Sequence, residues 1–445
     1  MSVYKNNNDI PNNLNNSVNS NFSYNYYPYS NRTLSTNASL TKSYNYNVKL
    51  NITFYFDFST GQTYTFNDNP YNIFASTLDK FIKKNFYRNI KDKIKCVICN
   101  ANKVDFNKTL LENNINQNSH VFCYIDNQID INDTFVNTII QGVGFKFYGL
   151  ISKAGRDQNG YHKINQDSSI VCLNIGNIKG FNLFGVIDGH GLNGDLLSQF
   201  CRDYFILQLN LYANQCKLEF NFTPEGIYNK LKLSDFKFIK DCFKNVDIEM
   251  TKQLNFEYNF SGASFTLVIQ LKHYLICANV GNSRSILIFD NDTNINQGIF
   301  ILSEDHTPYQ HQEKIRIIDN KGMIAKHQNK FGKIDERLRV YKLGHNYPGL
   351  LITRSLGDFI GKECGVINKP HIIELKKNHN FKYMVIGSEG IWRAIKNEDV
   401  RNLGNIYYQK GEIGNFCKDL VTKAVENWAK IDICRDDITL VCVYF

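Results

Sequence analysis

The 445-residue sequence lacks the features that mark membrane and exported proteins. No apolar run approaches the roughly 18 residues that a membrane-spanning helix needs. The N-terminus has no apolar segment of the kind found in secretory signal peptides, and residue 2 is Ser, so N-myristoylation is not indicated. We therefore expect no membrane span and a cytoplasmic location, with the nucleus left open as an alternative.

Basic blocks and cysteine clusters are also missing. The net charge of +9 is mild for this length, and no Lys/Arg block forms the stripe typical of nucleic-acid binding, so no nucleic-acid partner is expected. The 12 Cys are scattered, most of them within apolar runs, which favours buried thiols in a reducing compartment. The one C-x-x-C, Cys96–Cys99, has no second ligand pair at matching spacing, so strand cysteines are favoured over a zinc site.

Residues 1–46 differ in composition from the rest of the chain. The whole sequence is 43% hydrophobic and 13% aromatic, enough for a sizeable core, but this segment is Asn, Ser and Tyr with few aliphatic residues. Such a segment cannot bury enough apolar surface to offset its ordering entropy. We predict a disordered tail, with a docking or phosphorylation segment as the alternative.

Residues 47–126 have the pattern of a small β-grasp domain. "VKLNITFYFDFSTGQTYTF" alternates around a Ser-Thr-Gly turn, which is typical of a β-hairpin, and the next segment places Phe74, Leu78, Phe81 and Ile82 on one helical face. "IKCVICN" and "SHVFCYI" follow as strands, with "KVDFNKTLLENNI" between them as a short helical connection. This order resembles ubiquitin-like domains, which implies a binding module with a protein partner. The segment has no C-terminal Gly-Gly, so conjugation is not expected.

Residues 144–445 indicate an α+β domain. Short apolar runs such as "FNLFGVID", "GASFTLVIQL" and "DITLVCVYF" alternate with helical patterns over 193–213, 235–254, 308–321 and 415–429. Many strands with helices grouped between them favour a β-sandwich flanked by helices.

Acidic residues lie at the ends of four predicted strands: Asp167, Asp188, Glu389 and Asp436. In "FGVIDGHG" a strand ends at Asp188, Gly189 lets a backbone carbonyl approach a cation, and His190 is placed to donate a proton. Strand ends can converge at one edge of a sandwich, which is the arrangement that a two-metal hydrolase needs. The ordinary alternative is that each Asp caps a strand or a helix.

Eight sequence blocks, taken in order, resemble the PPM-type, metal-dependent protein serine/threonine phosphatases: "KINQD", "FGVIDGHG", "SGASFTLVI", "CANVGNSRSIL", "LSEDHTPYQHQEKIRI", "ITRSLGDF", "VIGSEGIW" and "CRDDITLVCVYF". The resemblance implies two packed antiparallel sheets flanked by helices. It also implies two Mg²⁺ or Mn²⁺ ions at one end of the sandwich and a metal-bridging water that attacks phosphorus without a covalent enzyme intermediate. The partner is then a phosphoprotein substrate, and we expect a monomer.

The resemblance also implies roles by position. Asp188 matches the bridging metal ligand, Gly189 a carbonyl ligand, and Asp436 the C-terminal metal ligand. Asp167 matches the acidic residue that holds metal-bound waters, and His190 the residue proposed to protonate the leaving oxygen of Ser or Thr.

The metal ligands depart from the family pattern at three positions. Glu389 stands where the family has Asp, which keeps a carboxylate but predicts weaker Mg²⁺ binding or a preference for Mn²⁺. Asn282 replaces an Asp that helps to hold a third, weaker metal, and Arg393 replaces another Asp.

The phosphate-binding Arg that the family carries before "NQD" is not in place. His162 and Lys163 lie there instead, with Arg156 further off. Lys is a usable phosphate contact, but without the bidentate geometry of Arg.

Arg393 is the main objection to a working metal site. At about 6 Å and an effective dielectric constant near 20, a unit charge repels a dication by roughly 5 kcal/mol. The family usually has Asn where Asp437 stands, so we predict an Arg393–Asp437 ion pair that neutralises the arginine, with an Arg393 that points into solvent as the alternative. Three functions stay open: an active phosphatase, a pseudophosphatase that binds phosphoproteins as a regulatory module, and a scaffold dominated by the ubiquitin-like domain.

Overall fold

The computed structural model describes residues 50–56, 63–68, 72–85, 94–99, 102–108, 110, 113, 119–125, 134–138 and 143–445, the last range without 158, 220–222, 254–257, 291–297, 329–333 and 433. The predicted tail, residues 1–46, lies outside the described residues.

The first described elements form a five-stranded sheet and one helix. They are β1 (Leu50–Phe56), β2 (Thr63–Asp68), α1 (Phe74–Asn85), β3 (Ile94–Cys99), β4 (Asn102–Lys103) and β5 (Ser119–Ile125). The strand order is β2-β1-β5-β3-β4, with β1 antiparallel to β2 and parallel to β5. The predicted hairpin, helix and strands are thus confirmed at these positions. In the predicted helical connection, the described residues 104–108 form a turn instead.

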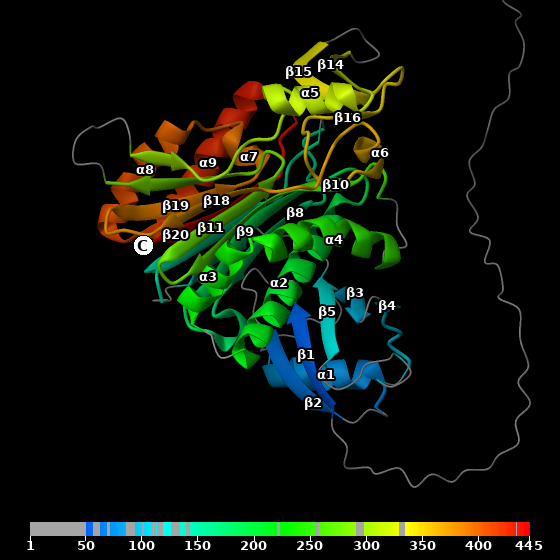
Figure 1. The fold of residues 1–445 in the computed structure, drawn as a ribbon, viewed down its shortest axis with the longest axis vertical. Helices are drawn as coiled ribbons and strands as arrows, with labels where there is room; N and C mark the ends of the chain where they lie inside the picture. Colours follow the sequence, from blue (N-terminus) through cyan, green and yellow to red (C-terminus); the bar gives the residue numbers. More distant parts are fainter. Residues whose placement is uncertain are drawn as a thin grey trace, which may run out of the picture. The chain divides into compact units, whose positions relative to one another are not determined.

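Two antiparallel sheets make up the centre of the remaining chain (Figure 1). The first has the order β18-β11-β10-β9-β8, with β17 also paired to β10. Its strands are β8 (Asp167–Cys172), β9 (Phe181–His190), β10 (Gly262–Leu271), β11 (Tyr274–Val280), β17 (Leu356–Gly357) and β18 (His371–Lys376).

The second sheet has the order β13-β12-β19-β20-β7-β6. Its strands are β6 (Thr134–Thr138), β7 (Phe147–Lys153), β12 (Arg284–Phe289), β13 (Ile299–Ile301), β19 (Phe381–Gly387) and β20 (Ile438–Tyr444). Because β6 pairs with β7, this sheet begins before the boundary predicted at residue 144.

Helices cover the outer face of each sheet (Figure 1). Those on the first sheet are α2 (Gly194–Leu218), α3 (Pro224–Leu233) and α4 (Lys237–Gln253), with the short 3-10 helix η2 (Ile175–Asn177) before them. Those on the second are α7 (Glu389–Trp392), α8 (Asn397–Lys410) and α9 (Ile413–Ile431). The predicted helices over 193–213, 235–254 and 415–429 are confirmed, and so is the β-sandwich flanked by helices.

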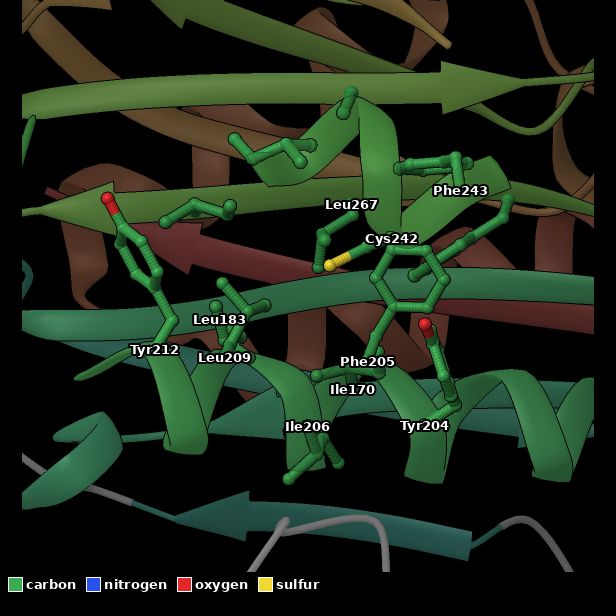
Figure 2. Close-up of a cluster of buried hydrophobic side chains, with 14 of the residues drawn as sticks. Ile170, Leu183, Tyr204, Phe205, Ile206, Leu209, Tyr212, Cys242, Phe243 and Leu267 are labelled. Carbon is green, nitrogen blue, oxygen red and sulfur yellow. The ribbon is translucent and has the colours of Figure 1, made fainter. Parts of the chain in front are cut away.

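Each sheet is buried on both faces, and alternate residues of a strand pack into different cores. Along β9, Leu183 and Ile187 pack toward the helices, whereas Phe184 and Val186 pack between the sheets, as the alternation of side chains in a strand requires. In the helix-facing core, Phe205 of α2 lies 4.7 Å from Phe243 of α4 between ring centroids (Figure 2). Such packing holds the ends of β8 and β9 in a fixed register.

A small third sheet completes the structure. It contains β14 (Gly322–Gln328), β15 (Ile334–Lys342) and β16 (Pro348–Leu350), with α5 (His311–Asp319) before it and α6 (Phe359–Lys362) after it. The predicted helix over 308–321 is confirmed as α5. None of the helices in the described part of the chain combines the length and apolarity that a bilayer crossing requires.

Candidate active site

Two aspartates face each other where β8 and β9 pair. Asp167 is the first residue of β8, and its cross-strand partner is Asp188 of β9. Asp167 is 5% exposed, and neither of its carboxylate oxygens accepts a hydrogen bond of normal geometry from a described residue. Burial and the charge of Asp437 raise the pKa of Asp167 well above its ordinary value, and burial and Asp167 do the same for the pKa of Asp188. Burial and mutual repulsion therefore disfavour the charged form of both carboxylates.

The turn between β19 and α7 brings a third carboxylate to the pair. The Glu389 backbone N–H donates to Asp188 Oδ2 at 3.0 Å. Two tryptophans hold the turn, because the Trp392 indole donates to the Gly387 carbonyl and the Trp428 indole to the Gly390 carbonyl. Burial and Asp436 raise the pKa of Glu389. The turn thus serves to carry Glu389 to Asp188.

The two residues just before β20, Asp436 and Asp437, have different surroundings. Asp436 is part-exposed, and its Oδ1 lies 3.6 Å from Lys163 Nζ. Asp437 is buried and accepts backbone hydrogen bonds from Gly155 at 2.6 Å and from Gln166 at 2.9 Å. Asp437 therefore ties both ends of the connection between β7 and β8 to the start of β20.

The predicted Arg393–Asp437 ion pair is wrong. The Asp437 carboxylate is occupied by the two backbone N–H groups, and no ion pair within 4 Å joins it to Arg393 in the described chain. Arg393 instead places its guanidinium over the ring of Trp428, 4.6 Å from the centroid. A cation over an aromatic face is stabilised without an anionic partner.

The residues that depart from the family pattern meet around Glu389. Asn282 Nδ2 donates to Glu389 Oε2 at 2.8 Å. Arg337 of β15 approaches from the third sheet, with Nη1 3.7 Å from Glu389 Oε1. The charges of Arg337 and Arg393 oppose the rise of the Glu389 pKa. Sequence reasoning missed Arg337, because nothing in its local sequence "DERLRV" points to a site some fifty residues away.

A histidine–aspartate pair lies beside the carboxylates. His190 Nε2 is 2.8 and 3.0 Å from the two carboxylate oxygens of Asp358, which is fully buried. Burial lowers the pKa of His190, but Asp358, Asp188 and Glu389 together outweigh burial, so the pKa is raised. Asp358 was also missed, although it stands in the quoted block "ITRSLGDF", whose Asp could have been paired with the His of "DGHG".

The predicted phosphate contacts differ in their placement. Lys163 faces the carboxylates: burial lowers its pKa, but Asp437, Asp436, Asp167 and Asp188 together raise it. His162 is exposed, and its backbone pairs with Arg156 at an isolated bridge. Successive residues of an extended segment point to opposite sides, so His162 is turned away when Lys163 faces the site. Arg156 donates to the Gly160 carbonyl of its own loop.

Gly189 stands where no side chain fits. A Cβ at this position would lie 2.2 Å from the Gly194 carbonyl oxygen and 2.5 Å from that of Gln166. The backbone of residue 189 is therefore packed directly against the first residue of α2 and the residue before β8.

The donor set fits hard divalent cations. Its oxygens come from Asp167, Asp188, Glu389 and Asp436, and oxygen ligands are those that Mg²⁺ and Mn²⁺ take. The Asp167 oxygens without a hydrogen bond of normal geometry and the raised pKa values of Asp167, Asp188 and Glu389 indicate an excess of negative charge that cations would offset. No three Asp, Glu, His or Cys side chains of the described residues already surround one point, so the carboxylates must adjust to share an ion.

Comparisons with known proteins identify a family for this chain. The family model described as protein phosphatase 2C matches residues 155–430. "Probable protein phosphatase 2C 12" of Oryza sativa subsp. japonica is 30% identical over 319 residues, which cover 64% of this chain and 79% of that protein. "Probable protein phosphatase 2C 73" of Arabidopsis thaliana is 27% identical over 301 residues, 64% of this chain and 77% of that protein.

A solved structure shares the fold. The crystal structure of serine-threonine phosphatase 2C from Toxoplasma gondii matches with a TM-score of 0.58 at 20% identity, over 70% of this chain and 99% of that one. At this identity the likeness concerns the fold alone.

Proposed function

Because this chain belongs to the protein phosphatase 2C family, the metal-dependent PPM type, we propose that it hydrolyses phosphoserine and phosphothreonine in phosphoprotein substrates with Mg²⁺ or Mn²⁺. The observation that carries the proposal is the pair of facing carboxylates, Asp167 and Asp188, with Glu389 beside it. Arg393 was the main argument for the pseudophosphatase, and its packing on Trp428 does not favour that alternative.

Each residue then has a role. Asp188, Asp436, Glu389 and the Gly189 carbonyl would hold two cations, and Asp167 would hold water beside them. When bound, the cations supply Lewis acidity and lower the pKa of a water molecule. Lys163 adds positive charge for the phosphate, and His190, oriented by Asp358, donates a proton to the leaving oxygen.

The direct test is hydrolysis of a phosphoserine peptide by the full chain with Mn²⁺, with Mg²⁺ and with a chelator. We expect turnover with either metal and none with the chelator. Binding of the phosphopeptide without turnover under any metal condition would replace the phosphatase with the pseudophosphatase.

Restoring the shorter carboxylate, Glu389→Asp, is expected to tighten Mg²⁺ binding or to shift the preference from Mn²⁺ toward Mg²⁺. Mg²⁺ requires near-ideal octahedral geometry. The Glu389 side chain, which is longer than that of Asp and accepts a hydrogen bond from Asn282, meets this requirement less well. Both metals are titrated against activity and by calorimetry, with Glu336→Asp, an exposed glutamate of β15, as the control. Unchanged affinities would argue against Glu389 as a ligand.

The double change Asn282→Asp with Arg393→Asp is expected to add a second, weaker phase of metal activation. It replaces an amide and a cation near Glu389 with two carboxylates, which is the charge that a further cation needs. Activity is measured from micromolar to millimolar Mn²⁺, with Asn282→Asp alone as the control. A single activation phase identical to that of the natural protein would count against a lost third site.

We also infer that residues 47–126 form a ubiquitin-like β-grasp domain that binds a protein partner. The inference is supported by the sheet order β2-β1-β5-β3-β4, by the parallel pairing of β1 with β5, and by the position of α1 between the hairpin and β3. A dispersed amide spectrum from residues 47–126 alone is the expected result, and a random-coil spectrum would contradict it.

A further inference from the structure

Arg337 brings a guanidinium from the third sheet to the carboxylates of the site. Its Nη1 lies 3.7 Å from Glu389 Oε1, and its side chain is 31% exposed. The charge of Asp436 also acts on it, after those of Asp335 and Glu389. At 3.7 Å the contact with Glu389 is an ion pair but too long for a hydrogen bond. Arg337 therefore faces the site without being fully engaged by it.

Asp335 fixes the orientation of this guanidinium. Arg337 Nε lies 3.0 Å from Asp335 Oδ1, and Nη2 lies 2.8 Å from Oδ2, so the pairing is bidentate. Asp335 is held in turn by Arg339, whose Nη2 is 3.0 Å from Asp335 Oδ2 and whose Nη1 donates to the Gly349 carbonyl. The pairing uses two of the three nitrogens of Arg337 and leaves Nη1 directed at Glu389.

Two positively charged side chains, Lys163 and Arg337, approach the carboxylates of the site. Lys163 meets Asp436 at 3.6 Å from one side, and Arg337 meets Glu389 from another. Arg156, the nearest arginine before "NQD", donates a hydrogen bond to the Gly160 carbonyl and not to the site. Lys163 alone offers a point charge without the fork that matches phosphate oxygens.

We propose that Arg337 binds the phosphoryl group of the substrate and supplies, from β15, the guanidinium that the family pattern places before "NQD". The inference rests on the proposed function. Once bound cations neutralise the charges of Glu389 and Asp436, Arg337 Nη1 and Lys163 Nζ no longer pair with these carboxylates, although Asp335 still holds Arg337, and both become available to a phosphate dianion. The competing role is structural, in which Arg337 only ties the third sheet to α7.

The two roles predict opposite results for metal and phosphate binding. In Arg337→Gln, binding of inorganic phosphate to the Mn²⁺-loaded protein should weaken about 10- to 100-fold, because a charge-assisted hydrogen bond is lost. Mn²⁺ affinity in the absence of phosphate should rise severalfold, because a cation next to Glu389 is removed. Arg337→Lys, which keeps the charge but not the fork, should weaken phosphate binding less than Arg337→Gln does and leave Mn²⁺ affinity nearly unchanged.

Calorimetric titration with Mn²⁺ and then with phosphate measures both affinities, and KM and kcat for a phosphopeptide accompany them. Lys326→Gln is the matched control, because it removes a cation of the same sheet that pairs with the exposed Glu336 and contacts no carboxylate of the site among the described residues. It should keep both affinities within about twofold. Unchanged phosphate binding in Arg337→Gln, or phosphate and Mn²⁺ binding that weaken together, would overturn the inference. Phosphate binding that depends on Arg337 in a protein that hydrolyses no phosphopeptide would uphold it and overturn the proposed function.

Discussion

Asp188→Asn is expected to lower phosphopeptide turnover by several orders of magnitude. Asp188 is the carboxylate on which the others converge: it faces Asp167, accepts the Glu389 N–H, and has its pKa raised by Asp167, Asp436 and Glu389. Asn keeps the shape and can still accept that hydrogen bond, but it removes the charge that two cations would share. The loss is thus chemical rather than structural.

Thermal unfolding separates these two kinds of loss. Without metal, Asp188→Asn should be at least as stable as the natural protein, because it removes one of two facing carboxylates whose charges repel each other. Mn²⁺ should raise the Tm of the natural protein and of a control, Glu336→Gln, but not that of Asp188→Asn. Near-normal turnover in Asp188→Asn would make the assignment of a two-metal centre wrong.

Strand and helix positions in residues 144–445 could be predicted because their burial is extreme. Every residue of β10 is buried, so "GASFTLVIQL" has to be an apolar run, and the long helices keep an apolar face toward a sheet. The order of the sheets, in contrast, depends on pairings between distant segments. The facing of Asp167 and Asp188 is a matter of register between β8 and β9, and no local pattern specifies it.

The site residues that the sequence predicted lie next to the ends of strands. The residues that it missed, Arg337 and Asp358, come from other parts of the fold. Asp188, Glu389 and Asp436 all lie at or just beyond strand ends, and their convergence follows from the sandwich. The Arg393–Asp437 pair failed because charge balance in a sequence does not tell which groups satisfy a side chain. Here a Trp ring accepts the cation, and backbone N–H groups satisfy the carboxylate.

Asp358 is expected to act through His190, and its effect should depend on the leaving group. The Asp358 carboxylate lies against Gly262, where a Cβ would be 2.2 Å from Oδ2, and it holds His190 Nε2 at 2.8 Å. Nδ1 is then the nitrogen left for the leaving oxygen. Asp358→Asn removes one of the charges that raise the His190 pKa, so a smaller fraction of the imidazole is protonated and ready to donate. We expect kcat for a phosphoserine peptide to fall about 10²- to 10³-fold.

For para-nitrophenyl phosphate, Asp358→Asn should lower kcat less than about tenfold. Nitrophenolate departs without a proton, so this reaction does not depend on a proton donor. His190→Gln should show the same division between the two substrates. The double variant should be no worse than His190→Gln alone, because residues that act as a unit are not additive. Equal losses for the two substrates in Asp358→Asn would mean that the aspartate maintains the fold around Gly262 and does not position the proton donor.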